Sequence, residues 1–128
     1  MKDTTKDWLS AAQDDIKSMR LLMQNPELTN IIAFHAQQAI EKSLKALMEE
    51  FDVEFIKTHN LKTLLAATNT NIIIEIRVLT ELDQLYLDSR YPGDLGLMPS
   101  GKPTMEDAQL YFEEADKIYK EIEKRIGA

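Results

Sequence analysis

Residues 34–47, FHAQQAIEKSLKAL, decide how the rest of the chain is organised. At about 100° per residue they predict a helix, because small and apolar side chains gather on one broad side. That side is made by Ala36, Ala39, Ile40, Ser43, Leu44, Leu47 and, beyond the stretch, Phe51. A second, narrow stripe contains His35, Gln38, Lys42 and Lys45, at spacings of three, four and three residues. We name it the His35–Lys45 stripe; it is either an ordinary solvated face or a binding surface.

The segments on both sides of this helix have helical patterns of their own. We expect long helices at about 4–24, 29–51 and 72–89 and from Thr104 onward, with a short helix that Thr58 caps. The sequence therefore predicts an all-α fold, an up-and-down helical bundle of four long helices plus one short helix, within one domain over residues 1–128.

Local signals refine the helix ends. Thr4 with Asp7, and Thr104 with Asp107, have the spacing of capping boxes. The run 72–74, three isoleucines, could alternatively begin a strand, but the apolar spacing that follows it favours a helix. We therefore expect that helix to include all three isoleucines.

Aromatic residues outside the central helix have two interpretations each. Trp8 is in phase with the core residues of the first helix, so we expect a core position rather than a stacking platform for a base. Phe55 and Ile56, in the connector after the central helix, either tuck against the end of the bundle or contact another subunit.

Three ordered motifs carry a family resemblance. They are HAQQAIEK at 35–42, followed by Lys45 one turn later; KTHNL at 57–61; and SRYPG at 89–93. Together they resemble prokaryotic HEPN domains, and the resemblance extends over nearly the whole chain. It implies a helical bundle, a homodimer and a separately encoded minimal nucleotidyltransferase as partner, often in a toxin–antitoxin system.

Composition excludes several classes of protein. A chain of 128 residues with 44% hydrophobic and 29% charged residues is typical of a globular protein. The absence of cysteine excludes disulfides and a thiol nucleophile. No apolar leader follows Met1, and the longest aliphatic run, 72–74, is too short for a membrane span, so we expect a cytoplasmic protein with no membrane contact.

The net charge of −7 restricts how the chain could bind nucleic acid. Non-specific affinity comes from neutralising phosphates with Lys and Arg, so an acidic domain needs a local basic patch. Lys42, Lys45 and Arg90 are the candidates.

Metal and cofactor sites are not expected. Neither a P-loop nor a dinucleotide-binding glycine motif is present, and two histidines without cysteine make a zinc site improbable. The adjacent acidic pairs 14–15, 49–50 and 113–114 splay about 100° apart on a helix, so we expect solvated faces rather than acid–base dyads.

The nuclease signature of the HEPN family is incomplete here. The resemblance implies an Arg followed, after four to six residues, by a His, and Arg90 stands in the matching region. Positions 95–97 are Leu, Gly and Leu, and both histidines, His35 and His59, precede Arg90. Ribonuclease activity is therefore not expected, and Arg90, His35 and His59 are only weak catalytic candidates. His59, in the first turn of the short helix, suits a loop-fixing role more than proton transfer.

The sequence thus favours a non-catalytic HEPN-like protein that binds a nucleotide or RNA and acts with a nucleotidyltransferase. The candidate binding residues are His35, Gln38, Lys42, Lys45, Arg90 and Tyr91. Arg90 can fork onto a phosphate or instead pair with a carboxylate such as Glu41, and Tyr91 can stack on a base or simply end its helix. The alternatives are a metal-independent endoribonuclease toxin that uses Arg90 with a non-standard His, and a protein-interaction bundle without enzymatic activity.

Overall fold

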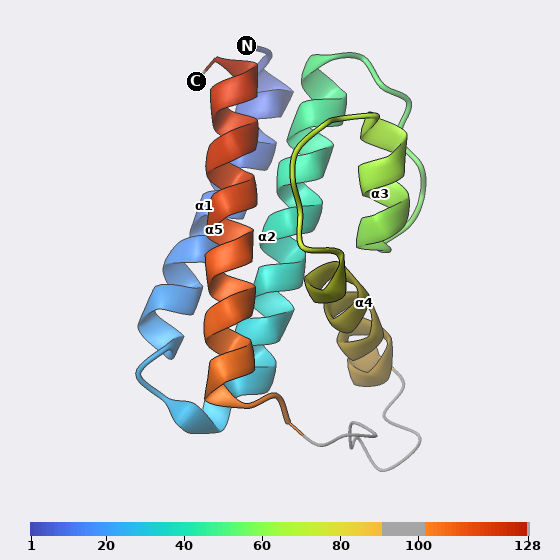
Figure 1. Ribbon diagram of the computed structural model, residues 1–128. Helices are drawn as coiled ribbons and strands as arrows, with labels where there is room; N and C mark the ends of the chain where they lie inside the picture. Colours follow the sequence, from blue (N-terminus) through green and yellow to red (C-terminus); the bar gives the residue numbers. More distant parts are fainter. Residues whose placement is uncertain (91–101, 128) are drawn as a thin grey trace.

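The computed structural model describes residues 1–90 and 102–127, and at Arg90 the backbone alone (Figure 1). This part of the chain is helical and contains no strand. Its elements are α1 (Asp3–Leu22), the 3₁₀ turn η1 (Pro26–Leu28), α2 (Thr29–Glu50), α3 (Leu61–Thr68), α4 (Ile76–Arg90) and α5 (Met105–Ile126). The prediction of an all-α fold with four long helices and one short helix is confirmed.

The long helices α1, α2, α4 and α5 run alternately down and up, and α3 lies on the outside next to α2 and α4 (Figure 1). The central helix is α2, which contacts all four other α-helices. In residues 1–90 and 102–127, no helix has both the length and the apolar character needed to cross a bilayer.

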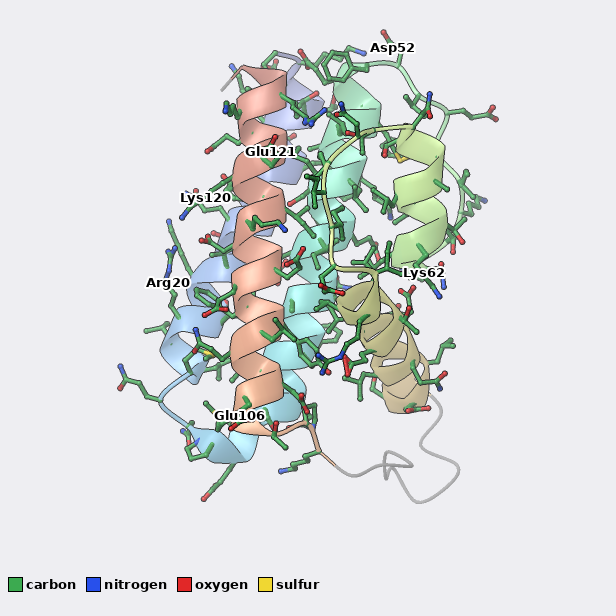
Figure 2. The ribbon with its side chains drawn as sticks, viewed as in Figure 1. Arg20, Asp52, Lys62, Glu106, Lys120 and Glu121 are labelled. Atoms are coloured by element: carbon green, nitrogen blue, oxygen red, sulfur yellow. The ribbon has the colours of Figure 1, made fainter. Side chains whose placement is uncertain are left out.

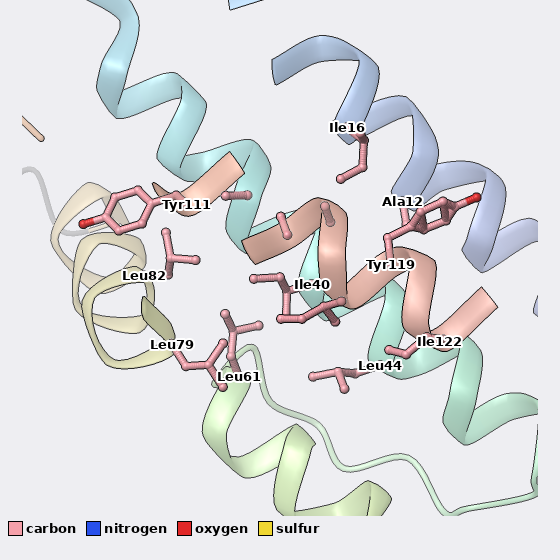
Figure 3. Packing of buried hydrophobic residues seen from close by; sticks show 14 of the residues in the cluster. Ala12, Ile16, Ile40, Leu44, Leu61, Leu79, Leu82, Tyr111, Tyr119 and Ile122 are labelled. Atoms are coloured by element: carbon pink, nitrogen blue, oxygen red, sulfur yellow. The ribbon is translucent and has the colours of Figure 1, made fainter. Parts of the chain in front are cut away.

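The core is centred on the apolar side of α2 that the sequence predicts. Ile40 and Leu44 belong to one core cluster with Ile16 of α1, Leu82 of α4 and Ile122 of α5, all fully or almost fully buried (Figure 3). Alanines of α2 are also fully buried, and their small side chains let neighbouring helices approach closely.

Trp8 packs at the edge of this core, as its spacing predicts. Its ring meets Phe55 edge-on at 6.0 Å, and the Nζ atom of Lys45 lies 5.4 Å from the ring centroid. Phe55 thus tucks against the bundle, although its side chain stays 41% exposed.

One of the two predicted capping boxes is present. The Thr104 hydroxyl accepts from the Asp107 backbone N–H at 3.0 Å, and the Asp107 carboxylate accepts from the Thr104 N–H, as predicted. The prediction of a capping box at Thr4 and Asp7 is wrong, because α1 begins at Asp3 and has no side-chain cap. The Thr4 hydroxyl instead donates to Glu49 of α2 at 2.6 Å.

Two other helix starts also differ from prediction. The N-cap of α3 is Asn60, whose side chain accepts from the Thr63 N–H, rather than Thr58. The isoleucines at 72–74 precede α4, and their exposure alternates in the manner of extended backbone: 8% for Ile72 and 86% for Ile73. Branched side chains disfavour helix, and α4 begins only at Ile76.

Candidate functional site

Two residues of the His35–Lys45 stripe, His35 and Lys42, are bound to α1. Asp15 Oδ1 lies 2.8 Å from His35 Nδ1, and Asp15 Oδ2 accepts from Lys42 Nζ at 2.8 Å. Asp15 is only 7% exposed, so the prediction that the pair 14–15 forms a solvated face is wrong for this residue. The carboxylate lies between the helices because it is paired with both side chains, and burial without such partners would be costly.

Glu41 forms a second junction, on another face of α2. It accepts from Lys45 Nζ at 3.0 Å and from Gln37 Nε2 at 3.1 Å, and its Oε1 lies 3.1 Å from His59 Nδ1. Burial opposes ionisation of Glu41, but the hydrogen bonds from Lys45 and Gln37 outweigh it and lower the pKa of this carboxyl below its ordinary value. Gln38 joins the junction by donating to Gln37 Oε1 at 2.7 Å.

These contacts change the interpretation of the stripe. All four of its side chains are partly buried and have partners within the chain, and both lysines are in salt bridges. The stripe is therefore built into the fold, with Lys42 still 25% and Lys45 16% exposed. More exposed charged side chains, such as Arg20 at 54% and Lys120 at 65%, lie elsewhere on the bundle (Figure 2).

His59 fixes the connector that leads into α3. Its backbone carbonyl accepts from Gln37 Nε2 at 2.9 Å, and its ring lies 5.3 Å from that of Tyr86 on α4, tilted by 40°. Beside it, Asp83 Oδ1 accepts from the Leu61 N–H at 2.7 Å and so anchors the start of α3. The loop-fixing role that the sequence favours agrees with these contacts.

The two histidines belong to different sites. His35 contacts α1 through Asp15, whereas His59 contacts Glu41 and Tyr86. In each case a carboxylate lies at Nδ1, which leaves Nε2 as the nitrogen able to exchange a proton with a ligand. A single active site that uses both rings is not formed within one chain.

A small pocket lies between the first half of α2 and the last half of α4, and we name it the α2–α4 pocket. Two aromatic side chains, Phe34 and Tyr86, line it together with several polar ones. The complete lining is Asn30, Ala33, Phe34, Gln37, Leu85, Tyr86 and Ser89. The exposed aromatic side chain at this pocket offers a surface against which a planar polar group such as a nucleobase can stack, beside amide and hydroxyl groups.

Sequence reasoning missed most of this lining. One available signal was Phe34, a large aromatic residue outside the apolar side of its helix, and its side chain is indeed 44% exposed. Asn30, Tyr86 and Ser89 come together only through the packing of α4 on α2.

Arg90, a candidate binding residue from the sequence, follows the last lining residue of the pocket in the chain. This residue ends α4, directly after Ser89, while its side chain and all of Tyr91 lie outside the described part of the structure. Among the described residues, no group of three or more His, Asp or Glu side chains is arranged to hold a metal ion.

Comparison with known proteins agrees with this architecture. The HEPN domain family matches residues 5–125, and the chain belongs to that family. Its structure is similar to the crystal structure of ST0689, an archaeal HEPN homologue, at 28% identity, with 98% of this chain and 99% of that chain covered and a TM-score of 0.75. It is also similar in fold to TT1696 from Thermus thermophilus, at 24% identity, with 97% of this chain and 99% of that chain covered and a TM-score of 0.77. A comparison with curated protein sequences gives no match.

Proposed function

We propose that this HEPN protein binds a nucleotide or an unpaired stretch of RNA at the end of the bundle where α2 begins and α4 ends, without cleaving it. The observation that carries the proposal is the α2–α4 pocket, whose aromatic and polar lining ends one residue before Arg90. A base would lie against the pocket, and Arg90 is the candidate residue for its phosphate because a guanidinium can donate two hydrogen bonds to a phosphate.

The charges of the central helix support a narrow site rather than a broad footprint. Lys42 and Lys45 are paired with Asp15 and Glu41, and the chain carries a net charge of −7. Their part in binding is correspondingly smaller than that of Arg90, because a lysine must leave its carboxylate before it contacts a phosphate.

Binding without cleavage is proposed because the catalytic histidine is missing from its usual place. Neither histidine follows Arg90 in the sequence, and both have a carboxylate partner within the fold. The second candidate function, a metal-independent endoribonuclease, rests on the Nε2 atoms of these two rings, which a second copy of the chain could bring to Arg90.

A nucleotidyltransferase partner and a homodimer complete the proposal. The family resemblance suggests both. Exposed apolar side chains at the end of α2 and in the connector after it are candidates for such a contact: Phe51 is 57%, Phe55 41% and Ile56 43% exposed. Mass measurement of the purified protein and co-purification with the nucleotidyltransferase of the same source test this part.

The test of binding uses a fluorescein-labelled octaribonucleotide in buffer with chelator, with anisotropy for binding and gel analysis for cleavage. We expect binding by the wild type, clear weakening in Arg90→Ala and no cleavage by either. Arg20→Ala is the matched control, since it removes the same charge from an exposed position on α1, away from α4 (Figure 2).

The outcomes separate the candidate functions. Equal binding by Arg90→Ala and wild type would contradict the proposed site. Cleavage by the wild type that Arg90→Ala abolishes would establish the ribonuclease instead. Absence of binding at any concentration would leave a protein-interaction role.

A further inference from the structure

Asn30 carries an unsatisfied acceptor at the α2–α4 pocket. It lies in the first turn of α2 and lines the pocket, and its Oδ1 atom is buried with no hydrogen-bond partner among the described residues. Buried polar atoms in proteins are almost always paired, because an unmet hydrogen bond is energetically costly. A buried acceptor at a ligand pocket therefore suggests that a donor arrives with the ligand.

The size of the pocket restricts this donor. Its volume is about 20 Å³, enough for about one water-sized group and too small for an aromatic ring. An amino group can enter, while the ring that carries it stays at the mouth.

Phe34 supplies a surface for such a ring. Its side chain lines the same pocket yet is 44% exposed, and its ring meets that of His35 edge-on, at 5.5 Å and 77°. Stacking of a base on an exposed aromatic side chain tolerates any base, so it supplies affinity without selecting among them.

We infer that this pocket selects an unpaired nucleobase by its exocyclic amino group, with Asn30 Oδ1 as the acceptor and Phe34 as the stacking surface. The inference rests on the proposed function and gives it a substrate class. Cytosine and adenine carry such an amino group, whereas uracil and hypoxanthine have a carbonyl oxygen at the same position and would place acceptor against acceptor. The base can belong to a free nucleotide or to single-stranded RNA.

The experiment compares ligands that differ only in this group. Titration calorimetry measures the affinities of CMP and UMP and of AMP and IMP. Anisotropy measures the affinities of labelled octacytidylate and octauridylate. We expect the amino-bearing member of each pair to bind about tenfold more tightly, which corresponds to about 1.4 kcal/mol. A preference seen with mononucleotides identifies free nucleotides as sufficient ligands, and one confined to the octamers identifies RNA.

Two variants assign the preference to its residues. Asn30→Ala should bind cytidine and uridine ligands equally, whereas Asn71→Ala, an exposed asparagine elsewhere, should keep the tenfold preference. Phe34→Ala should weaken both ligands about tenfold and keep their ratio, and Leu21→Ala, 80% exposed on α1, should weaken neither. Circular dichroism checks that each variant is folded.

The comparison of ligands on the wild type can overturn the inference without any variant. Equal affinity within every pair overturns base selection and leaves the proposed binding function standing. A preference that persists in folded Asn30→Ala also overturns it, because Asn30 would then only hold a buried water. Absence of binding to all ligands overturns the inference together with the proposed function.

Discussion

Replacing Glu41 by alanine should lower the free energy of unfolding by about 3 kcal/mol. The side chain is 5% exposed and joins Lys45, Gln37 and His59. Its loss leaves the ammonium group of Lys45, whose side chain is only 16% exposed, without its counter-charge, and the Gln37 amide without one of its acceptors.

The magnitude follows from the burial of these partners. Breaking a buried ion pair by removing one partner costs about 3–5 kcal/mol, and a hydrogen bond to a charged group about 1.5–3 kcal/mol. The half-exposed His59 can turn to water, and Lys45 can extend into solvent, which places the expected value at the lower end. For a chain of this size the loss lowers Tm by roughly 10 °C.

The isosteric variant Glu41→Gln isolates the charge. It keeps an acceptor for Gln37 and Lys45, so it should lower the free energy of unfolding by only about 1–2 kcal/mol at neutral pH. Because the folded-state pKa of Glu41 is lowered, its carboxylate contributes stability above its unfolded pKa, and this contribution is lost as pH falls through the folded pKa. Wild type and Glu41→Gln should therefore approach each other in stability as the pH is lowered below about 4.

Urea unfolding followed by circular dichroism measures these differences at pH 7 and across the acid range. Glu121→Ala is the matched control, since that glutamate is 41% exposed on α5 and pairs with Arg125 at the surface, and it should change stability by about 0.5 kcal/mol or less. A cost below about 1 kcal/mol for Glu41→Ala would refute the view that this junction ties α2 to the connector.

Three further predictions concern other parts of the fold. Asp83→Ala should cost about 2 kcal/mol and speed amide exchange throughout α3, because the Leu61 N–H loses its acceptor; unchanged exchange in α3 would contradict this. Thr104→Ala should lower the free energy of unfolding by about 1 kcal/mol, because the Asp107 N–H loses its acceptor. An unchanged midpoint in urea unfolding would refute the contribution of this cap to stability. Burial, reinforced by the nearby Glu81, raises the pKa of Tyr111 to about 12, so the free energy of unfolding of wild type should fall by about 2 kcal/mol more than that of Tyr111→Phe as pH rises from 10 to 12; equal falls in the two proteins would contradict this.

The parts of the fold that were predictable depend on interactions within a few residues. The apolar spacing of residues 36–47 identified the central helix and its buried side, since a period of 3.6 residues is a property of the helix itself. The capping box of Thr104 and Asp107 was predictable for the same reason, because both hydrogen bonds close within three residues.

The same rule failed where a distant residue competed for the same group. Thr4 and Asp7 have the spacing of a capping box, but the Thr4 hydroxyl donates to Glu49, 45 residues away. Asp15 was predicted to face solvent because adjacent acidic residues splay about 100° apart on a helix, yet His35 and Lys42 reach it from α2, 20 and 27 residues away. Partners at such separations follow from the packing of helices, which a local pattern does not contain.

The pairing of these charges decides how an acidic HEPN protein can hold an anion. In the His35–Lys45 stripe both lysines already have carboxylate partners, so few cations of the central helix are available to a phosphate. Each phosphate that a cation neutralises contributes a slope of about −0.7 to the salt dependence of binding to a single strand. A site that depends on Arg90 and base contacts should then show a total slope of about −0.7, and a slope near about −2 would mean that Lys42 and Lys45 leave Asp15 and Glu41 to join the ligand.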